Sequence, residues 1–424
     1  MQRQIKVNLG NLVLSLSEAM DLADPSITRH QQRVAFVVWE MAREAELCSD
    51  EMERVFLAAL LHDIGAFSLE EKVSLHESKA DPEELEIHCV RGQRLLEKVP
   101  WLNRAADIVR FHHRDWREWD LPIGEHIVFD SQLVALADFV ERSLKRDVFV
   151  LHQHETIISA VIEQLGTAFH PDVVDLFVES SRREEFWLDL VSPRLYSLLL
   201  NEGPFRQIEV GLENILTISE LFRNIIDFRS RFTSTHSAGV AVCGAVLASL
   251  FGLSETEAKL MEVAGNLHDI GKLAIDNSIL NKPGKLTEAE MAVMKAHAYY
   301  TYSVIKTIGG LQQIAEWAGY HHEKLDGSGY PFRCSENELS TGARILMVAD
   351  IFTALIEDRP YRQGMKRDKV TGILRSMADG HQLDSRIVEL LLDNYDYVHA
   401  AVAQSQQAAR TLYEQQCSCV RPAA

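Results

Sequence analysis

The sequence predicts an all-α protein made of two copies of one helical module. Apolar residues recur with helical spacing, as at Ile218, Leu221, Phe222 and Ile225, whereas the alternation typical of strands is scarce. In addition, the same series of histidines and aspartates occurs twice along the 424 residues, in the same order. At about 150 residues per domain, this length accommodates two or three domains. We therefore expect two tandem helical domains that arose by duplication.

The first copy occupies residues 1–202. Seven residues with nitrogen or oxygen donors define it: His30, His62, Asp63, His88, His112, His113 and Asp138. His30 precedes the His-Asp pair by 32 residues, and His88 precedes the His-His pair by 24 residues. A Leu-rich apolar segment then runs into Gly203 and Pro204, which predicts a domain boundary at 202/203.

The second copy, residues 203–424, repeats both spacings. Its seven donor residues are His236, His268, Asp269, His297, His321, His322 and Asp350. Imidazoles and carboxylates on successive apolar segments form a set of ligands that two metal ions can share. A ligand set without thiolate suits iron or manganese and excludes few other divalent transition metals.

Further motifs surround these donors in the second copy. Lys272 follows Asp269 by three residues in an apolar helical run, so its ammonium is expected on the ligand side. A surface lysine at a helix end is the alternative. The glycine-rich segment from Asp326 to Pro331 comes soon after His322. Arg359 and Arg362 follow Asp350 and could contact phosphate, although a salt bridge to Asp358 is the alternative for one of them.

Together these motifs resemble the HD-GYP family of HD-superfamily metal-dependent cyclic dinucleotide phosphodiesterases, over residues of about 205–400. The resemblance implies that one metal binds His236, His268, Asp269 and Asp350. It implies that the other binds His297, His321, His322 and a bridging Asp269. It also implies that Asp269 and Lys272 are catalytic. Substrate contacts implied by the resemblance come from Lys272, Asp326, Gly329, Tyr330, Arg359 and Arg362. Some members hold a third metal through a glutamate where this chain has Phe232, so two metals are expected.

The first copy keeps the donors but lacks the other motifs. Ala66 stands where the second copy has Lys272, a Trp116–Leu121 segment replaces the glycine-rich loop, and no arginine pair follows Asp138. Metal binding could have survived there without a substrate site. Residues 1–202 are therefore interpreted as a degenerate HD-like regulatory or scaffolding domain.

The resulting hypothesis is a bacterial second-messenger enzyme. It would open cyclic di-GMP or 3'-5'-linked cyclic GMP-AMP to the linear dinucleotide, with further cleavage to mononucleotides left open. A silent module that binds a cyclic dinucleotide or a partner protein is one alternative, but the complete ligand set and Lys272 argue against it. A general HD nucleotidase is another, and the glycine-rich loop argues against that.

The composition of the chain limits which binding partners and which cellular compartment are expected. A formal charge of −19 disfavours binding to bulk nucleic acid or anionic membranes. Six cysteines in this chain do not form a disulfide framework, and the N-terminus lacks an apolar signal core, so a cytoplasmic protein is expected. The uncharged run from Ser237 to Ser254 is interpreted as a buried helix rather than a membrane span. Self-association and a signalling-protein partner both stay open.

Overall fold

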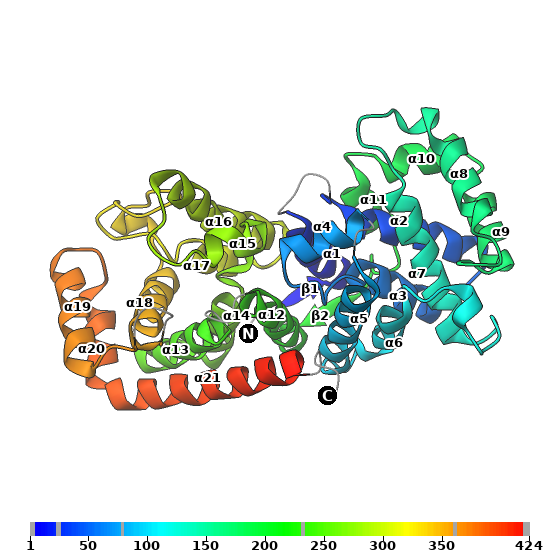
Figure 1. Ribbon diagram of the computed structural model, residues 1–424. Helices are drawn as coiled ribbons and strands as arrows, with labels where there is room; N and C mark the ends of the chain where they lie inside the picture. Colours follow the sequence, from blue (N-terminus) through cyan, green and yellow to red (C-terminus); the bar gives the residue numbers. More distant parts are fainter. Residues whose placement is uncertain (1–4, 23–26, 78–79, 230–233, 359–362, 419–424) are drawn as a thin grey trace. The chain divides into compact units, whose positions relative to one another are not determined.

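A computed structural model describes residues 5–22, 27–77, 80–229, 234–358 and 363–418 of the chain (Figure 1). Apart from two short strands, the regular secondary structure of the described residues is helical, which confirms the all-α prediction. The chain divides into two compact units. The N-terminal unit is Asn8–Glu209, and the C-terminal unit is Val210–Ala424 together with Met1–Val7. The boundary expected at 202/203 coincides with the end of a helix, because Gly203 follows its last residue, Glu202.

Helices of the N-terminal unit are short and numerous. They are α1 (Leu9–Asp21), α2 (His30–Glu44), α3 (Ser49–Leu61), α4 (Leu69–His76), α5 (Pro82–Glu97), α6 (Asn103–Phe111), η1 (Trp116–Glu118), α7 (His126–Arg142), η2 (Val150–His152), α8 (His154–Glu163), α9 (Pro171–Ser180), α10 (Glu184–Leu190) and α11 (Leu195–Glu202). Strands β1 (Lys6–Asn8) and β2 (Glu209–Gly211) pair in a two-stranded sheet.

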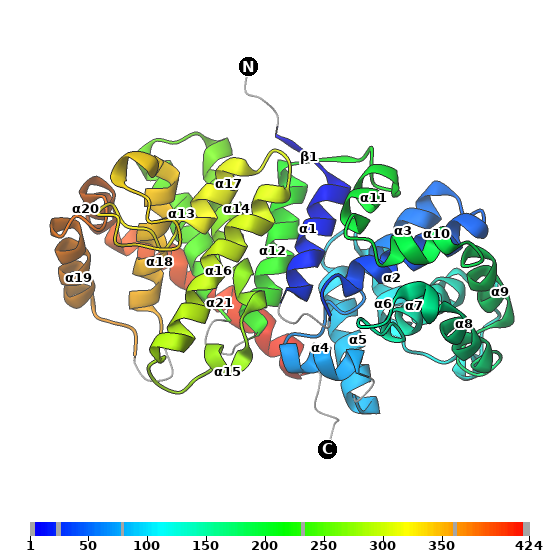
Figure 2. The same cartoon turned by 90° about the horizontal axis from the view of Figure 1, so that it is seen from above.

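The C-terminal unit contains longer helices. They are α12 (Leu212–Phe228), α13 (His236–Phe251), α14 (Glu255–Leu267), η3 (Ile270–Ala274), α15 (Asn277–Leu280), α16 (Glu288–Thr307), α17 (Gln312–Gly319), η4 (Glu336–Glu338), α18 (Thr341–Ile356), α19 (Arg367–Asp379), α20 (Ser385–Asp393) and α21 (Tyr395–Ser418). Figure 2 shows α16 and α17 side by side, and α17 also packs against α14.

The predicted duplication appears as one helix order and one packing pattern. The first donor set lies on, or within three residues after, α2, α3, α5, α6 and α7, and the second lies in the same way on or after α13, α14, α16, α17 and α18. The pairs α2–α3, α2–α7, α5–α6 and α3–α6 pack together, as do α13–α14, α13–α18, α16–α17 and α14–α17. The two donor sets therefore occupy corresponding places on corresponding helices or directly after their ends.

Helix ends follow from local side chains. Ser254 begins α14 with a capping box, because its hydroxyl accepts the backbone N–H of Glu257 while the Glu257 carboxylate accepts the backbone N–H of Ser254. Thr287 and Glu290 begin α16 in the same way. Gly252 ends α13 at a φ of 93°, a left-handed conformation that favours glycine.

The uncharged run starting at Ser237 forms most of α13, as predicted. This helix packs against α14, α18 and α21, and it buries Val240, Ala241 and Leu247 completely. Burial on several sides explains its lack of charged residues, because ionised groups are rarely buried without partners. Among the described residues, no helix combines the length and hydrophobicity needed to cross a membrane.

Candidate metal centre

The His268-Asp269 stretch lies at the end of a helix rather than within one. The expected continuous helical run is wrong here, because α14 ends at Leu267 and the 3-10 helix η3 starts at Ile270. The reason is a close approach between segments. A Cβ on Gly271 would lie 2.0 Å from the carbonyl oxygen of His297, so only glycine lets η3 touch α16. This contact brings Asp269 beside His297.

Thr301 on α16 also holds this segment in place, through two hydrogen bonds. Its hydroxyl donates to the carbonyl of His268 at 2.8 Å and accepts the backbone N–H of Gly271 at 3.0 Å. Thr301 is fully buried on α16, one turn after His297. The sequence analysis did not single out this residue, although its one-turn spacing from a ligand histidine was a usable signal.

All seven predicted ligands of the C-terminal unit converge. The ligand atoms of His236, His268 and Asp350 lie within 4.8 Å of one another, as do those of His297, His321 and His322. Asp269 lies between the two groups. Its Oδ2 is 3.2 Å from His268 Nε2, and its Oδ1 is 3.5 Å from His297 Nε2. This arrangement agrees with two ion positions that share Asp269.

Backbone carbonyls orient three of the histidines. The Nδ1 atoms of His268, His297 and His321 donate to the carbonyls of Gly265, Met294 and Ala318, at 2.8, 2.6 and 2.6 Å. Each bond commits the ring proton to Nδ1 and leaves the Nε2 lone pair facing the cluster. Metal-bound histidines typically use their other ring nitrogen in this way.

Glu357 orients His236. Its carboxylate accepts from His236 Nδ1 at 3.2 Å and from the Thr235 hydroxyl at 2.8 Å, while His236 Nε2 lies 3.1 Å from Asp350 Oδ1. The sequence analysis missed Glu357. Its position seven residues after Asp350, equivalent to two helical turns, was the available signal, although α18 ends one residue before it.

Protonation states favour a cation at the second ion position, whereas hydrogen bonds to two carboxylates outweigh burial and raise the pKa of His236, at the first position, to about 10. Burial lowers the pKa of His297 to about 3, and it also lowers the pKa values of His321 and His322. Burial raises the pKa of Asp269, but the charges of His268 and Lys272 outweigh it and hold that pKa well below its usual range. Neutral imidazoles and ionised carboxylates are the forms that bind metal.

Two buried atoms in the cluster lack a hydrogen-bond partner among the described residues. They are Nε2 of His268 and Oδ1 of Asp269. Unpartnered buried polar atoms cost about 1–3 kcal/mol each, and coordination of a metal ion would offset that cost. The donor set and these two atoms together fit a divalent transition-metal centre.

Lys272 lies on the ligand side, as expected. Its Nζ is 2.5 Å from Asp269 Oδ2, and 21% of its side chain remains exposed. The ammonium therefore adjoins both the cluster and solvent. Arg359, Arg362 and Phe232 lie outside the described residues, so their predicted positions stay predictions.

The glycine-rich loop packs directly on the cluster. The ring of Tyr330 lies 4.8 Å from that of His322, and Lys295 Nζ is 5.2 Å from the Tyr330 ring centroid. Asp326 shapes the turn, because its Oδ1 accepts the backbone N–H of Ser328 at 2.8 Å. A Cβ on Gly329 would lie 2.4 Å from the Cα of Glu323, so this glycine permits close packing.

Glu323 anchors the end of that loop. The buried carboxylate accepts backbone N–H groups from Phe332, Arg333 and Cys334 at 2.7, 3.1 and 3.0 Å. The sequence analysis did not single out this glutamate. Its position directly after the His321-His322 pair was the signal that could have identified it.

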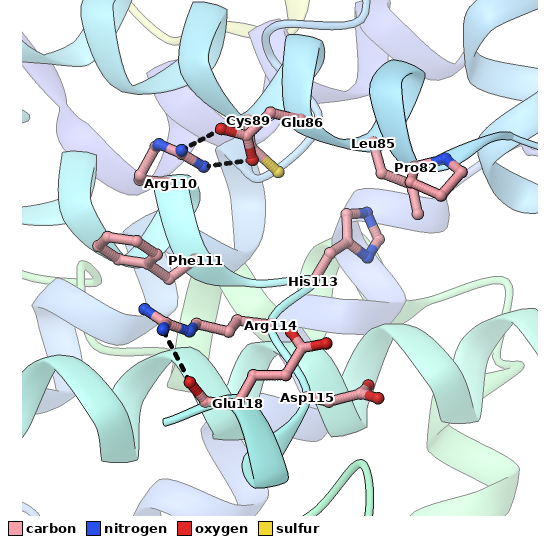
Figure 3. Close-up of a pocket in the computed structure, with 10 residues that line it drawn as sticks. All are labelled: Pro82, Leu85, Glu86, Cys89, Arg110, Phe111, His113, Arg114, Asp115 and Glu118. Atoms are coloured by element: carbon pink, nitrogen blue, oxygen red, sulfur yellow. Dashed lines mark hydrogen bonds and ion pairs between the residues drawn. The ribbon is translucent and has the colours of Figure 1, made fainter. Parts of the chain in front are cut away.

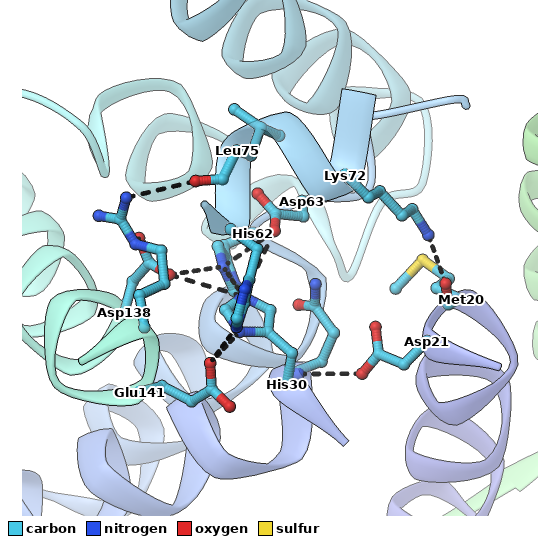
Figure 4. Close-up of polar contacts among 12 residues, drawn as sticks. Met20, Asp21, His30, His62, Asp63, Lys72, Leu75, Asp138 and Glu141 are labelled. Carbon is cyan, nitrogen blue, oxygen red and sulfur yellow. Dashed lines mark hydrogen bonds and ion pairs between the residues drawn. The ribbon is translucent and has the colours of Figure 1, made fainter. Parts of the chain in front are cut away.

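The N-terminal unit brings its own seven donors together. His30 Nε2 lies 3.2 Å from His62 Nε2, 3.4 Å from Asp63 Oδ2 and 3.5 Å from Asp138 Oδ1 (Figure 4). Asp63, His88, His112 and His113 form a second group, with ligand atoms within 4.8 Å of one another. Glu141 accepts from His30 Nδ1 at 2.6 Å, as Glu357 does from His236.

Comparisons with known proteins agree with this geometry. HD domain models match residues 27–143 and 220–387. A 3'3'-cGAMP-specific phosphodiesterase 1 of Vibrio cholerae is 31% identical, covering 94% of this chain and 95% of that protein. Phosphodiesterase 3 of the same specificity and organism is 27% identical, covering 86% and 90%. The cyclic di-GMP phosphodiesterase response regulator RpfG of Xanthomonas campestris is 40% identical, covering 42% and 47%.

A solved structure also matches both units. The crystal structure of a cyclic GMP-AMP-specific phosphodiesterase of V. cholerae aligns with a TM-score of 0.63 at 24% identity, covering 95% of this chain and 98% of that one. This likeness shows the fold. The full-length relative, the two domain matches and the two histidine–aspartate clusters lead to one conclusion: the chain belongs to the family of tandem HD-domain phosphodiesterases.

Proposed function

We propose that the C-terminal unit hydrolyses 3'3'-cyclic GMP-AMP to the linear dinucleotide. This proposal rests on how much of the chain aligns with relatives of each substrate specificity. Two 3'3'-cGAMP-specific relatives align over 94% and 86% of the chain and so include both units, whereas the RpfG match covers 42%. Cyclic di-GMP is the second candidate substrate, because that shorter match is 40% identical over 178 residues.

The seven ligands of the C-terminal unit hold two divalent transition-metal ions in this proposal, with iron or manganese favoured. His236, His268 and Asp350 serve one ion, His297, His321 and His322 serve the other, and Asp269 serves both. Such ions, when bound, generate hydroxide from water and neutralise phosphoryl oxygens. Water adds to phosphorus, one P–O bond to a ribose breaks, and the leaving oxygen takes a proton.

Lys272 positions the scissile phosphate. Its ammonium is paired with Asp269 and partly exposed, so a phosphoryl oxygen can approach it at the edge of the cluster. A preorganised charge at this place stabilises negative charge that develops in the transition state. Asp269 therefore has two roles, as a metal ligand and as the group that holds Lys272 in place.

The loop from Asp326 to Pro331 forms one wall of the substrate pocket. Tyr330 lies against His322, and Asp326 and Gly329 define the turn that holds it there. Arg359 and Arg362 are proposed phosphate contacts on the strength of the family pattern. Guanidinium groups suit this role because they can donate two parallel hydrogen bonds to one phosphate.

Substrate selectivity provides the test. The full-length protein, loaded with manganese or iron, is assayed separately with 3'3'-cGAMP, cyclic di-GMP and, as a linkage control, 2'3'-cGAMP. We expect kcat/KM to favour 3'3'-cGAMP by about tenfold or more, equivalent to about 1.4 kcal/mol. Equal values, or a preference for cyclic di-GMP, would assign the chain to the second candidate.

A further inference from the structure

The N-terminal unit contains a cavity of about 470 Å³ beside its second donor group. Residues of α5 and α6 and the segment after α6 line it, among them Glu86, Cys89, Arg110, His113 and Arg114 (Figure 3). Nothing in the proposed reaction of the C-terminal unit uses this cavity. Its volume falls within the range of small-molecule sites, which is roughly 300–1,000 Å³.

The internal repeat explains why a cavity exists at this place. Glu86 and His113 are the counterparts of Lys295 and His322, each 209 residues later. In the C-terminal unit, Tyr330 packs against both of those residues. The N-terminal unit has no such tyrosine, because Trp116–Leu121 replaces the loop. The space that Tyr330 fills in one unit is thus open in the other.

His113 connects this cavity to the donor group of Asp63, His88 and His112. Its Nε2 atom is buried and has no hydrogen-bond partner among the described residues. His88 Nδ1 and His112 Nδ1 donate to the carbonyls of Glu84 and Val109, at 3.1 and 2.7 Å. Their Nε2 atoms face inward, 3.6 and 3.8 Å from Asp63 Oδ1. Three imidazoles and one carboxylate therefore point at one position.

The cavity is not cationic by itself. Arg110 forms a forked ion pair with Glu86, and Asp115 and Glu118 also contribute carboxylates to the lining. Arg114 lies 4.7 Å from the Trp119 ring centroid and donates to the carbonyl of Glu118 at 2.7 Å. A bound divalent ion would reverse this balance of charge at the cavity wall, next to two guanidinium groups that stay fixed in place.

We propose that Asp63, His88, His112 and His113 bind one divalent transition-metal ion, and that its open coordination positions face the cavity and accept an oxygen of a phosphate-bearing ligand. Arg110 and Arg114 add charge-assisted hydrogen bonds to the same phosphate. Ala66 stands where Lys272 would be, so the N-terminal unit binds this ligand without the group that assists its hydrolysis. The inference does not depend on which substrate the C-terminal unit cleaves.

Metal content tests the ion. Full-length wild-type protein and three variants are loaded with Mn²⁺, desalted and analysed for manganese per chain. His113→Gln and His88→Gln should each hold one ion fewer than wild type. Gln93→Ala is the matched control, since Gln93 lies on the same helix as His88 but donates to Asp107 at the exposed surface. It should keep the wild-type count. Circular dichroism checks that each variant is folded, and equal counts in wild type and both folded histidine variants would overturn the proposal.

Water-proton relaxation tests the ligand. In an Asp269→Ala background, inorganic phosphate is titrated into the Mn²⁺-loaded full-length protein. Phosphate should displace metal-bound water and lower the relaxivity. Adding Arg114→Ala should raise the phosphate concentration needed by about tenfold, the scale of one charge-assisted hydrogen bond. A relaxivity that phosphate leaves unchanged would refute the oxyanion site, whatever the turnover of the C-terminal unit.

Discussion

Thr301 joins η3 to α16 in the C-terminal unit, whereas the N-terminal counterpart of this threonine is Gly92, which has no hydroxyl to donate. Glu323 anchors the C-terminal loop through three backbone N–H groups, and its counterpart is Arg114. Both units nevertheless bring seven donors together. The helix framework is thus sufficient to bring the seven donors together without counterparts of Thr301 and Glu323.

A second contrast lies at the last ligand of each unit. Arg142 Nε is 3.0 Å from Asp138 Oδ2, so a fixed positive charge occupies one side of that carboxylate. The counterpart of Arg142 is Ala354, and Asp350 instead has His322 Nδ1 3.9 Å from its Oδ2. A guanidinium next to a ligand carboxylate competes with a cation for its charge. We therefore expect Asp138 to bind a metal ion more weakly than Asp350.

The largest expected effect separates the two units directly. His268→Ala with Asp269→Ala should abolish turnover and release most of the bound metal, because it removes one histidine ligand and the shared carboxylate. His62→Ala with Asp63→Ala should leave the turnover of the C-terminal unit nearly unchanged. Steady-state assays and metal analysis of both double variants measure this. Loss of most turnover in a folded N-terminal double variant would show that the first unit takes part in catalysis.

Alanine at the two equivalent glycines should affect both stability and turnover. A Cβ on Gly271 meets the His297 carbonyl at 2.0 Å, and one on Gly65 meets the His88 carbonyl at the same distance. Each change should lower the free energy of unfolding of its unit by about 1–3 kcal/mol. Only Gly271→Ala should also reduce kcat, by about 10²-fold, because displaced ligands orient the substrate poorly. Thermal melts with parallel assays decide this, and equal kcat losses in both variants would contradict it.

Removing the ammonium of Lys272 should slow hydrolysis and leave the metals bound. Lys272→Ala is expected to lower kcat by about 10²-fold or more, since loss of one preorganised charge contact costs about 2.7 kcal/mol. The reciprocal change Ala66→Lys should create no activity in a protein whose C-terminal site is inactive. Wild-type turnover in Lys272→Ala would show that Lys272 is only a surface lysine at a helix end and has no role in hydrolysis.

The smallest effect is expected from the carboxylates that orient the first histidine of each unit. Glu357→Gln keeps the shape but weakens the bond to His236, so metal affinity should fall by about 10–100-fold. Glu141→Gln changes the equivalent contact of His30 and should leave turnover as in the wild type. Metal titrations monitored by activity compare the two variants. An unchanged metal affinity in Glu357→Gln would show that Glu357 does not position His236.

The sequence by itself determined the class of fold, the repeat and which histidines and aspartates form the two donor sets. Helical periodicity and the 32- and 24-residue spacings are local properties, so they can be read without knowing how helices pack. The family pattern then provided the division of ligands between two metals. It also provided Lys272 and the loop that contains Tyr330.

Only the tertiary structure showed which other residues position those ligands. Thr301, Glu323 and Glu357 act through contacts with segments up to 122 residues away, as between Thr235 and Glu357. The end of α14 before Asp269 depends on how closely Gly271 approaches α16. The cavity beside His113 lies between residues of α5, α6 and the segment after α6, where the N-terminal unit has no counterpart of Tyr330. Each of these features depends on distances between chain segments, which spacing along one chain does not determine.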